Sequence, residues 1–186
     1  KGNIKLALKS YKVAIKLNTN YLEAYFNLGG LLHETGNFQE AIDNYKCILK
    51  LKPDHPETYN NMGNTLKEMG QPGQAIKYFK KAIKLNPNFA EAYNNQGNWF
   101  RDKGFLNESI TSLEKAISLK ENYQDAFFNL GNSLNDQGKY DSALNYYDMA
   151  TRNNYYFPEV KHARIYLRQQ ICEWNELEKL EKEFPN

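Results

Sequence analysis

The hydrophobic positions of the chain follow a helical spacing that recurs at a constant interval. Tyr25, Leu28 and Leu32 fall at the i, i+3 and i+7 spacing that places side chains on one face of an α-helix. The same spacing returns from Tyr59 in the next unit and continues along the chain. The pattern therefore predicts one amphipathic helix in each unit, which we name helix A.

A second helix is predicted in each unit after a glycine. In the first complete unit, Gly36 ends helix A, and Ala41, Tyr45 and Leu49 mark the apolar side of the helix that follows, helix B. Pro53 closes helix B, because proline disfavours helical backbone at the residue before it. Each unit is therefore predicted to be a hairpin of two antiparallel helices.

Two series of glycines keep the same period as the apolar residues. The first series is Gly2, Gly36, Gly70, Gly104 and Gly138, and the second is Gly29, Gly63, Gly97 and Gly131. Gly36 ends helix A and lies in the turn to helix B. Gly29 is a small residue that allows helix A and helix B to approach closely. Tyr45, on helix B, is predicted to fill the space beside that approach.

The pattern aromatic-x-x-Leu-Gly-x-x-Leu, then Ala-x-x-x-Tyr, then Pro, at a period of about 34 residues, resembles the tetratricopeptide repeat (TPR) family. The resemblance implies an all-α fold, a right-handed TPR superhelix (α-solenoid) of antiparallel helix pairs with the A helices on its concave side. We expect a single solenoid over 1–186. Its parts are a lone helix B at 3–17, full repeats at 22–55, 56–89, 90–123 and 124–157, and a degenerate capping repeat at 158–186.

Polar residues recur on the side of each helix A that lies opposite its apolar face, in the order acid, amide, amide, acid. The amides are Asn27, Asn61, Asn95 and Asn129 in one series and Asn64, Asn98 and Asn132 in the other, where Gly30 is the exception. The acids are Glu23, Glu57, Glu91 and Asp125 at the start of the helices and Glu34, Glu68, Asp102 and Asp136 at the end. We call this set of residues the amide stripe.

A carboxamide can donate and accept hydrogen bonds, as a peptide group does, so the amide stripe favours an extended polypeptide held by its main chain. Asparagine is a mediocre helix former, which makes its recurrence on a merely solvated face unexpected. A structural alternative stays open, in which the amides bridge neighbouring helices or reflect a chain rich in asparagine. The series from Asn27 to Asn129 also resembles the asparagine ladder of the O-linked N-acetylglucosamine transferase superhelix, which implies the same role.

Charge is distributed unevenly between the two helices of each unit. The acids of the amide stripe should make the A side negative, with Lys67 and Arg101 as the nearest cations, whereas lysines gather on the outer helix B. We therefore expect the partners to be extended protein or peptide segments that are basic or rich in Ser and Thr. If polyacidic peptides bound more tightly than basic ones, this expectation would be wrong.

Several classes of function are disfavoured by the composition. A net charge of +2 is small for a protein that neutralises many phosphates, so we expect no nucleic acid partner. No apolar run is long enough to span a bilayer, so we expect no membrane partner. Two distant cysteines give neither a disulfide framework nor a metal site, and they fit an intracellular, cytoplasmic location.

No catalytic or cofactor constellation is recognisable, so we expect the chain not to be an enzyme and to use no cofactor and no metal. His33, His55 and His162 are read as surface histidines because no nucleophile or carboxylate stands at a suitable spacing. TPR domains that clamp a terminal carboxylate use cationic residues on their A helices. Phe26 and Asn60 stand at two of the corresponding places here, which disfavours that function.

The last unit carries a second resemblance. Cys172 and Trp174 are read first as parts of a capping unit, yet the run Ile-Cys-Glu-Trp at 171–174 is similar to the junction unit of O-linked N-acetylglucosamine transferases and their SPINDLY-type relatives. Because the chain also begins at Lys1 within a repeat, we expect a fragment. The leading hypothesis is the substrate-recognition arm of a larger protein O-glycosyltransferase, and the alternative is a free-standing TPR scaffold or adaptor.

Self-association is a third possibility. The lone helix B at 3–17 is predicted to expose an apolar face because it lacks its own helix A. The residues of that face are Leu6, Leu8, Tyr11 and Ile15.

Overall fold

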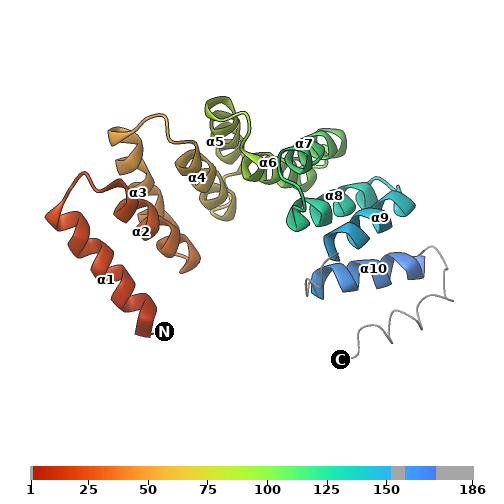
Figure 1. Ribbon diagram of the computed structural model, residues 1–186, viewed down its shortest axis with the longest axis horizontal. Coiled ribbons are helices and arrows are strands. Elements are labelled where there is room, and N and C mark those ends of the chain that lie inside the picture. Colours follow the sequence, from red (N-terminus) through yellow and green to blue (C-terminus); the bar gives the residue numbers. More distant parts are fainter. Residues whose placement is uncertain (1, 152–157, 171–186) are drawn as a thin grey trace. The chain divides into compact units, whose positions relative to one another are not determined.

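The structure is a computed structural model that describes residues 2–151 and 158–170 (Figure 1). Its regular structure is entirely α-helical in these residues, which confirms the all-α prediction. The helices are α1 (Gly2–Leu17), α2 (Leu22–Glu34), α3 (Phe38–Leu51), α4 (Pro56–Glu68), α5 (Pro72–Leu85), α6 (Ala90–Asp102), α7 (Leu106–Leu119), α8 (Gln124–Asp136), α9 (Tyr140–Thr151) and α10 (Pro158–Gln170).

The helices alternate as the period predicts and pack as antiparallel pairs. The A helices are α2, α4, α6, α8 and α10, and the B helices are α1, α3, α5, α7 and α9. Helix α2 packs on α3, α4 on α5, and α8 on α9. Successive pairs are joined by contacts between a helix B and the next helix A, as in α3 with α4 and α7 with α8. The lone helix B is α1, which packs on α2.

The turn from helix A to helix B explains the first glycine series. Gly36 has a φ angle of +77°, a left-handed conformation that is strained for residues with a Cβ atom. Its backbone N–H donates to the carbonyl of His33, and the N–H of Asn37 donates to the carbonyl of Leu32. This pair of bonds ends the helix as a Schellman motif. The left-handed glycine recurs at Gly70, Gly104 and Gly138.

The second glycine series marks where helix A touches helix B. A Cβ atom added to Gly29 would lie 2.5 Å from the ring of Tyr45, closer than carbon atoms can pack. Tyr45 is 1% exposed, so its ring fills the space that the glycine leaves open. The same arrangement recurs as Gly63 with Phe79, Gly97 with Leu113 and Gly131 with Tyr147.

The chain divides into two compact units, which are considered separately below. Unit 1 is Lys1–Asn95 and unit 2 is Gln96–Asn186, so the boundary falls within α6. The core of unit 1 is built around fully buried side chains on α3, α4 and α5, such as Ile48, Met62 and Phe79. The core of unit 2 includes Leu113 and Leu130. A single solenoid over 1–186 stays a prediction.

Two departures from the repeat pattern are accommodated without loss of a helix. Pro72, which replaces the usual aromatic residue of the turn, stands in the first turn of α5, where proline lacks only an N–H that would be unpaired. Glu121 replaces a closing proline, and here Asn122 adopts a left-handed φ of 54° after the end of α7. Asparagine tolerates this conformation better than most residues do.

The last unit is described only in its first helix. Val160 and Leu167 of α10 are buried in the core of unit 2, and Arg164 forms an ion pair of 2.8 Å with Asp148 on α9. The predicted cap residues Cys172 and Trp174, and the 171–174 motif with them, lie outside the described residues.

Candidate functional site

The amide stripe lies on the side of each A helix that faces away from the buried residues. Its acids are exposed except Glu91, which is half-buried, and its amides are half-buried except Asn27, which is exposed. In α2 the opposite side carries Ala24, Leu28 and Leu32, each 2% exposed. The helical period therefore leaves the stripe residues at least partly accessible on α2, α4, α6 and α8.

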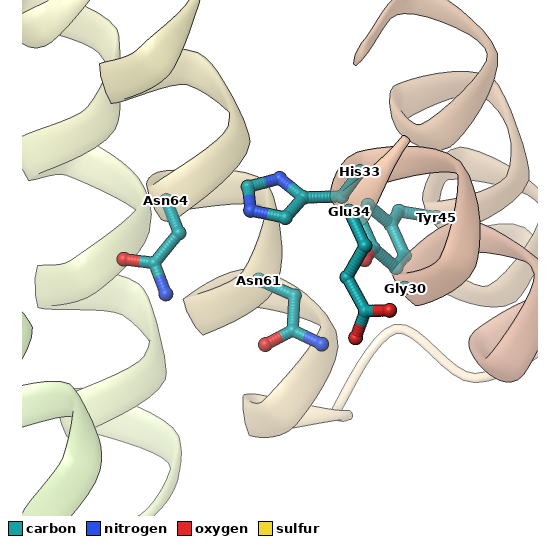
Figure 2. Close-up of a pocket in the computed structure, with 6 residues that line it drawn as sticks. All are labelled: Gly30, His33, Glu34, Tyr45, Asn61 and Asn64. Carbon is teal, nitrogen blue, oxygen red and sulfur yellow. The ribbon is translucent and has the colours of Figure 1, made fainter. Parts of the chain in front are cut away.

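In unit 1 the stripe borders a pocket between α2 and α4 with a volume of about 210 Å³ (Figure 2). Asn61 and Asn64 extend into it from α4, and Glu34 enters from α2. Gly30, the exception in the amide series, forms part of the wall. A Cβ atom added at Gly30 would meet nothing within 4 Å.

Tyr45 and His33 complete the lining of this pocket. Burial raises the pKa of Tyr45 to about 12, a hydrogen bond with Asn61 lowers the pKa in part, and the charge of Glu34 raises it. The hydroxyl of Tyr45 therefore stays protonated at neutral pH. The sequence pattern treats Tyr45 as a core residue only, yet a buried tyrosine usually directs its hydroxyl to a polar partner, which is the signal that could have identified it.

His33 joins α2 to α4 through both ring nitrogens. Its Nδ1 lies 3.0 Å from Oγ1 of Thr65, and its Nε2 lies 3.3 Å from Oε1 of Glu68. The reading of His33 as a simple surface histidine is therefore wrong, because its side chain is only 23% exposed and both nitrogens have partners. His55 is also structural, since its Nδ1 accepts a hydrogen bond from the N–H of Thr58 at the start of α4.

Several stripe amides hydrogen-bond within the protein. The side-chain N–H of Asn95 donates to Oδ1 of Asn60 at 2.9 Å, and this bond joins α6 to α4 within unit 1. In unit 2 the hydroxyl of Tyr147 donates to Oδ1 of Asn132 at 2.8 Å. Oδ1 of Asn98 is buried and has no hydrogen-bond partner among the described residues. At Asn95 the structure thus favours the bridging role that the sequence left open.

The acids at the ends of the A helices are partly neutralised. Glu68 lies beside His33, and Asp136 accepts a hydrogen bond from Nε of Arg101 at 2.7 Å. In both cases the arginine or histidine lies in the last turn of one helix A. The acid that it contacts stands 35 residues later in the sequence, on the next helix A. Glu34, which lines the pocket, has no ion-pair partner among the described residues.

The positions that would clamp a terminal carboxylate hold packing residues. Phe26 lies with its ring 5.7 Å from that of His55, and Asn60 and Asn94 are each 5% exposed. Groups of three or more potential metal ligands are absent from the described residues. None of the described helices is both long and apolar enough to cross a membrane.

Models of tetratricopeptide repeats match most of the chain. A TPR repeat model matches residues 1–36, 30–70 and 97–135, which together make up more than half of the chain. Two further tetratricopeptide repeat models match residues 56–89 and 128–167. No curated protein sequence matches the chain at a significant level.

Solved structures with the same fold are numerous. The type IV pilus biogenesis factor PilW aligns with a TM-score of 0.88 at 18% identity, over 98% of this chain and 84% of its own. MamA aligns with a TM-score of 0.68 at 24% identity, over 94% of both chains. YrrB, described as a TPR protein with an unusual peptide-binding site, aligns with a TM-score of 0.66 at 24% identity over 88% of this chain and 84% of its own.

Proposed function

Because the chain belongs to the tetratricopeptide repeat family, we propose that it binds an extended segment of another protein along the amide stripe of its A helices. The observation that carries the proposal is the pocket of unit 1, where Asn61 and Asn64 reach an open space beside the carboxylate of Glu34. The peptide-binding site of YrrB, a protein of the same fold, supports this class of ligand.

The amides of the pocket suit a polypeptide main chain. A free peptide group needs one acceptor for its N–H and one donor for its C=O, and a single carboxamide supplies both. Neighbouring A helices lie about 8–10 Å apart and an extended chain advances about 3.3 Å per residue, so each helix would meet about every third ligand residue. Binding by this means tolerates many ligand sequences.

The hydrogen-bond partners of the stripe amides separate residues that are available to a ligand from residues that join neighbouring helices. Asn61 and Asn64 face the pocket of unit 1, where Asn61 also hydrogen-bonds Tyr45, whereas one N–H of Asn95 is held by Asn60. Asn27 is exposed on α2 and extends the same side of the helix. We assign main-chain binding in unit 1 to Asn27, Asn61 and Asn64, and a mixed role to Asn95.

Charge gives the ligand its preferred composition. Glu34 is exposed at the pocket and has no ion-pair partner among the described residues, so it offers a site for a lysine, an arginine or a hydroxyl group of the ligand. Glu68 is shared with His33 and contributes less. We therefore propose basic or Ser/Thr-rich segments, with an affinity that falls as salt rises.

The test uses the full chain and two labelled probe peptides, one alternating Arg, Ser and Thr and the other with Glu in place of Arg. In fluorescence anisotropy the basic probe should bind more tightly. Replacing Asn27, Asn61 and Asn64 by Ala should weaken binding by about 0.5–1.5 kcal/mol for each hydrogen bond lost. A matched control replaces two exposed amides of the B helices, Gln39→Ala and Gln74→Ala. Equal affinity of the folded triple variant and the control would refute the proposal.

The narrower hypothesis of a glycosyltransferase arm is less well supported than the alternative of a scaffold or adaptor. The matching family models describe tetratricopeptide repeats alone, and the similar structures align over most of their own length. The 171–174 motif that carried the resemblance lies outside the described residues. Codons beyond Asn186 in the gene separate the two, because a glycosyltransferase pattern there would restore the narrower hypothesis.

A further inference from the structure

Unit 1 carries a strongly basic surface on the side of its B helices. Helices α1, α3 and α5 contain ten lysines and no arginine, and their only acids are Glu40 and Asp43. All ten lysines are exposed. The corresponding helices of unit 2, α7 and α9, contain one lysine, Lys115, and four acids. The positive charge is therefore a property of one set of B helices and not of the repeat as such.

The lysines keep the period of the repeat. Two ladders with the same step as the glycine series run across the three helices, and they are Lys12, Lys46 and Lys80, and Lys16, Lys50 and Lys84. Members of the two ladders stand four residues apart on each helix, which places them on one side of it. Lys5, Lys9, Lys77 and Lys81 broaden the array. We call these ten residues the lysine face.

Few charges of the lysine face are neutralised within the protein. Lys12 lies 3.5 Å from Glu40, and Lys46 lies 3.3 Å from Asp43, both in exposed pairs. Exposed pairs of this kind are weak in water. Lys50, Lys80 and Lys84 have no ion-pair partner among the described residues. The face therefore keeps most of its positive potential.

Exposed aliphatic side chains lie beside these lysines. Leu6 is 65% exposed, Val13 48%, Leu17 84% and Leu51 44%. Leu6, Val13 and Leu17 follow the i, i+7 and i+11 spacing along one side of α1, and each directly follows a lysine in the sequence. The outer surface of α1 is therefore both basic and apolar.

The exposure of Leu6 does not result from the missing partner of α1. The positions equivalent to Leu6 in α3, α5 and α7 are Glu40, Gln74 and Glu108, and all are exposed although these helices have a complete helix A beside them. Position 6 thus faces outward in every repeat, and α1 differs by placing a leucine there.

The apolar face predicted for 3–17 needs correction in three of its four residues. Leu8, Tyr11 and Ile15 are half-buried, so they are not the exposed residues that the prediction assumed. Leu6 is exposed on a different side of the helix, together with Val13 and Leu17. Because each of these three residues directly follows a lysine, the sequence pattern alone did not indicate a second apolar side of α1.

We propose that the lysine face binds the surface of an anionic lipid membrane, with Leu6, Val13 and Leu17 entering the headgroup region. A basic helix with exposed leucines is the arrangement that places a protein on a bilayer without crossing it. Lysines near an anionic leaflet each add attraction, and their long stems let the ammonium groups reach the phosphates while the leucines insert. The described helices include none that could cross a membrane, and this finding does not bear on a contact with the membrane surface.

Other anionic partners fit the face less well. Nucleic acid recognition commonly uses arginine and stacking aromatic rings, and α1, α3 and α5 hold no arginine. An acidic peptide would account for the lysines but not for the exposed Leu6, Val13 and Leu17 on one side of α1. The combination of a two-dimensional lysine array with protruding leucines favours a lipid surface.

The experiment is co-sedimentation of the full chain with vesicles of phosphatidylcholine alone or mixed with phosphatidylglycerol. The chain should bind the mixed vesicles at about 0.1 M salt and much less at about 1 M, where the screening length falls from about 10 Å to about 3 Å. It should not bind pure phosphatidylcholine measurably. Poly-glutamate and a single-stranded RNA serve as competing anions.

Two variants with equal net charge locate the contact. Removing three lysines of the face by Lys50→Gln, Lys80→Gln and Lys84→Gln should lower binding at least about tenfold. The control removes three exposed lysines of unit 2, Lys103→Gln, Lys115→Gln and Lys139→Gln, and should stay within about twofold of the original chain. A third variant, Leu6→Gln, Val13→Gln and Leu17→Gln, should also bind at least about tenfold less. Circular dichroism confirms that each variant is folded.

Three results would overturn the proposal. The first is no binding of the original chain to the mixed vesicles at low salt. The second is an equal loss in both lysine variants, which would show attraction by net charge alone. The third is tight binding of poly-glutamate or RNA without vesicle binding, which would assign the face to another class of macromolecule.

Discussion

Asn95 donates a hydrogen bond from its side-chain N–H to Oδ1 of Asn60, 2.9 Å away on the preceding helix A. Asn60 is 5% exposed, so the bond satisfies a polar group that water reaches poorly. One member of the amide stripe thus fixes the relation of α6 to α4 within unit 1. Its second N–H and its oxygen remain the groups that can meet a ligand.

We predict a measurable coupling between these two residues. Asn60→Ala should destabilise the chain by about 1–2 kcal/mol, because it removes a buried hydrogen bond, and Asn95→Ala by about 1 kcal/mol. The double variant should show a coupling energy of about 0.5–1.5 kcal/mol in a urea-denaturation cycle. Strict additivity would mean that the bond contributes nothing to stability.

Adding an amide at Gly30, the exception in the amide series, tests the role of the amide stripe directly. Gly30→Asn should raise affinity for the basic probe peptide about 2–10-fold, because it places an amide where α4 has Asn64 and its Cβ atom would meet nothing within 4 Å. Gly30→Ala is the control, since it should stabilise α2 by about 1 kcal/mol without adding a hydrogen bond. Anisotropy and thermal unfolding distinguish the two. A gain in affinity with alanine as large as that with asparagine would contradict the predicted role of the amide.

Alanine substitutions at Gly63, which contacts Phe79, and at Gly73 should change the stability of the chain in opposite directions. Gly63→Ala should destabilise the chain by about 1–2 kcal/mol, because the new Cβ atom would lie 2.5 Å from the ring of Phe79. Gly73→Ala, at an exposed site of α5 with nothing within 4 Å, should stabilise it by about 0.5–1 kcal/mol. Urea-denaturation midpoints measure both. Stabilisation by both substitutions would show that helix propensity, and not packing, determines these sites.

Alkaline pH should weaken the fold through its buried tyrosines. Burial raises the pKa of Tyr45 and of Tyr147 from 10.0 to about 12. The unfolded chain therefore releases these protons first, so stability is complete below pH 10 and falls as pH rises toward 12, by about 2–3 kcal/mol for each tyrosine. Urea-denaturation midpoints from pH 8 to 11 follow the loss.

The phenylalanine variants are the control for this pH dependence. Tyr45→Phe and Tyr147→Phe together should remove most of the slope above pH 10, because phenylalanine has no proton to release. An unchanged slope in the double variant would assign the alkaline loss to other groups.

The period of the sequence was sufficient to predict the helices and the roles of their glycines. Gly36 and Gly29 differ in function, one ending a helix and the other admitting a ring, and both roles follow from position within the hairpin. The bounds of α1 agree closely with the predicted helix at 3–17. Repeats make such predictions reliable because each unit provides an independent copy of the same pattern.

The partners of the stripe residues could not be predicted in the same way. A helical projection gives the direction of Asn95 and His33 but not which residue of the neighbouring helix lies opposite. Asn60 and Glu68 stand 35 residues from these partners, one more than the period, and only the packing of successive hairpins establishes that offset.

The contact between Gly29 and Tyr45 has a consequence for how such a chain gains or loses repeats in evolution. Both residues belong to the same repeat, so a duplicated segment brings its own small residue and its own ring. Unequal recombination in the gene can therefore add or delete whole hairpins without requiring compensating mutations inside them. The number of hairpins, and with it the length of partner that the protein can contact, can then change without altering how well each hairpin folds.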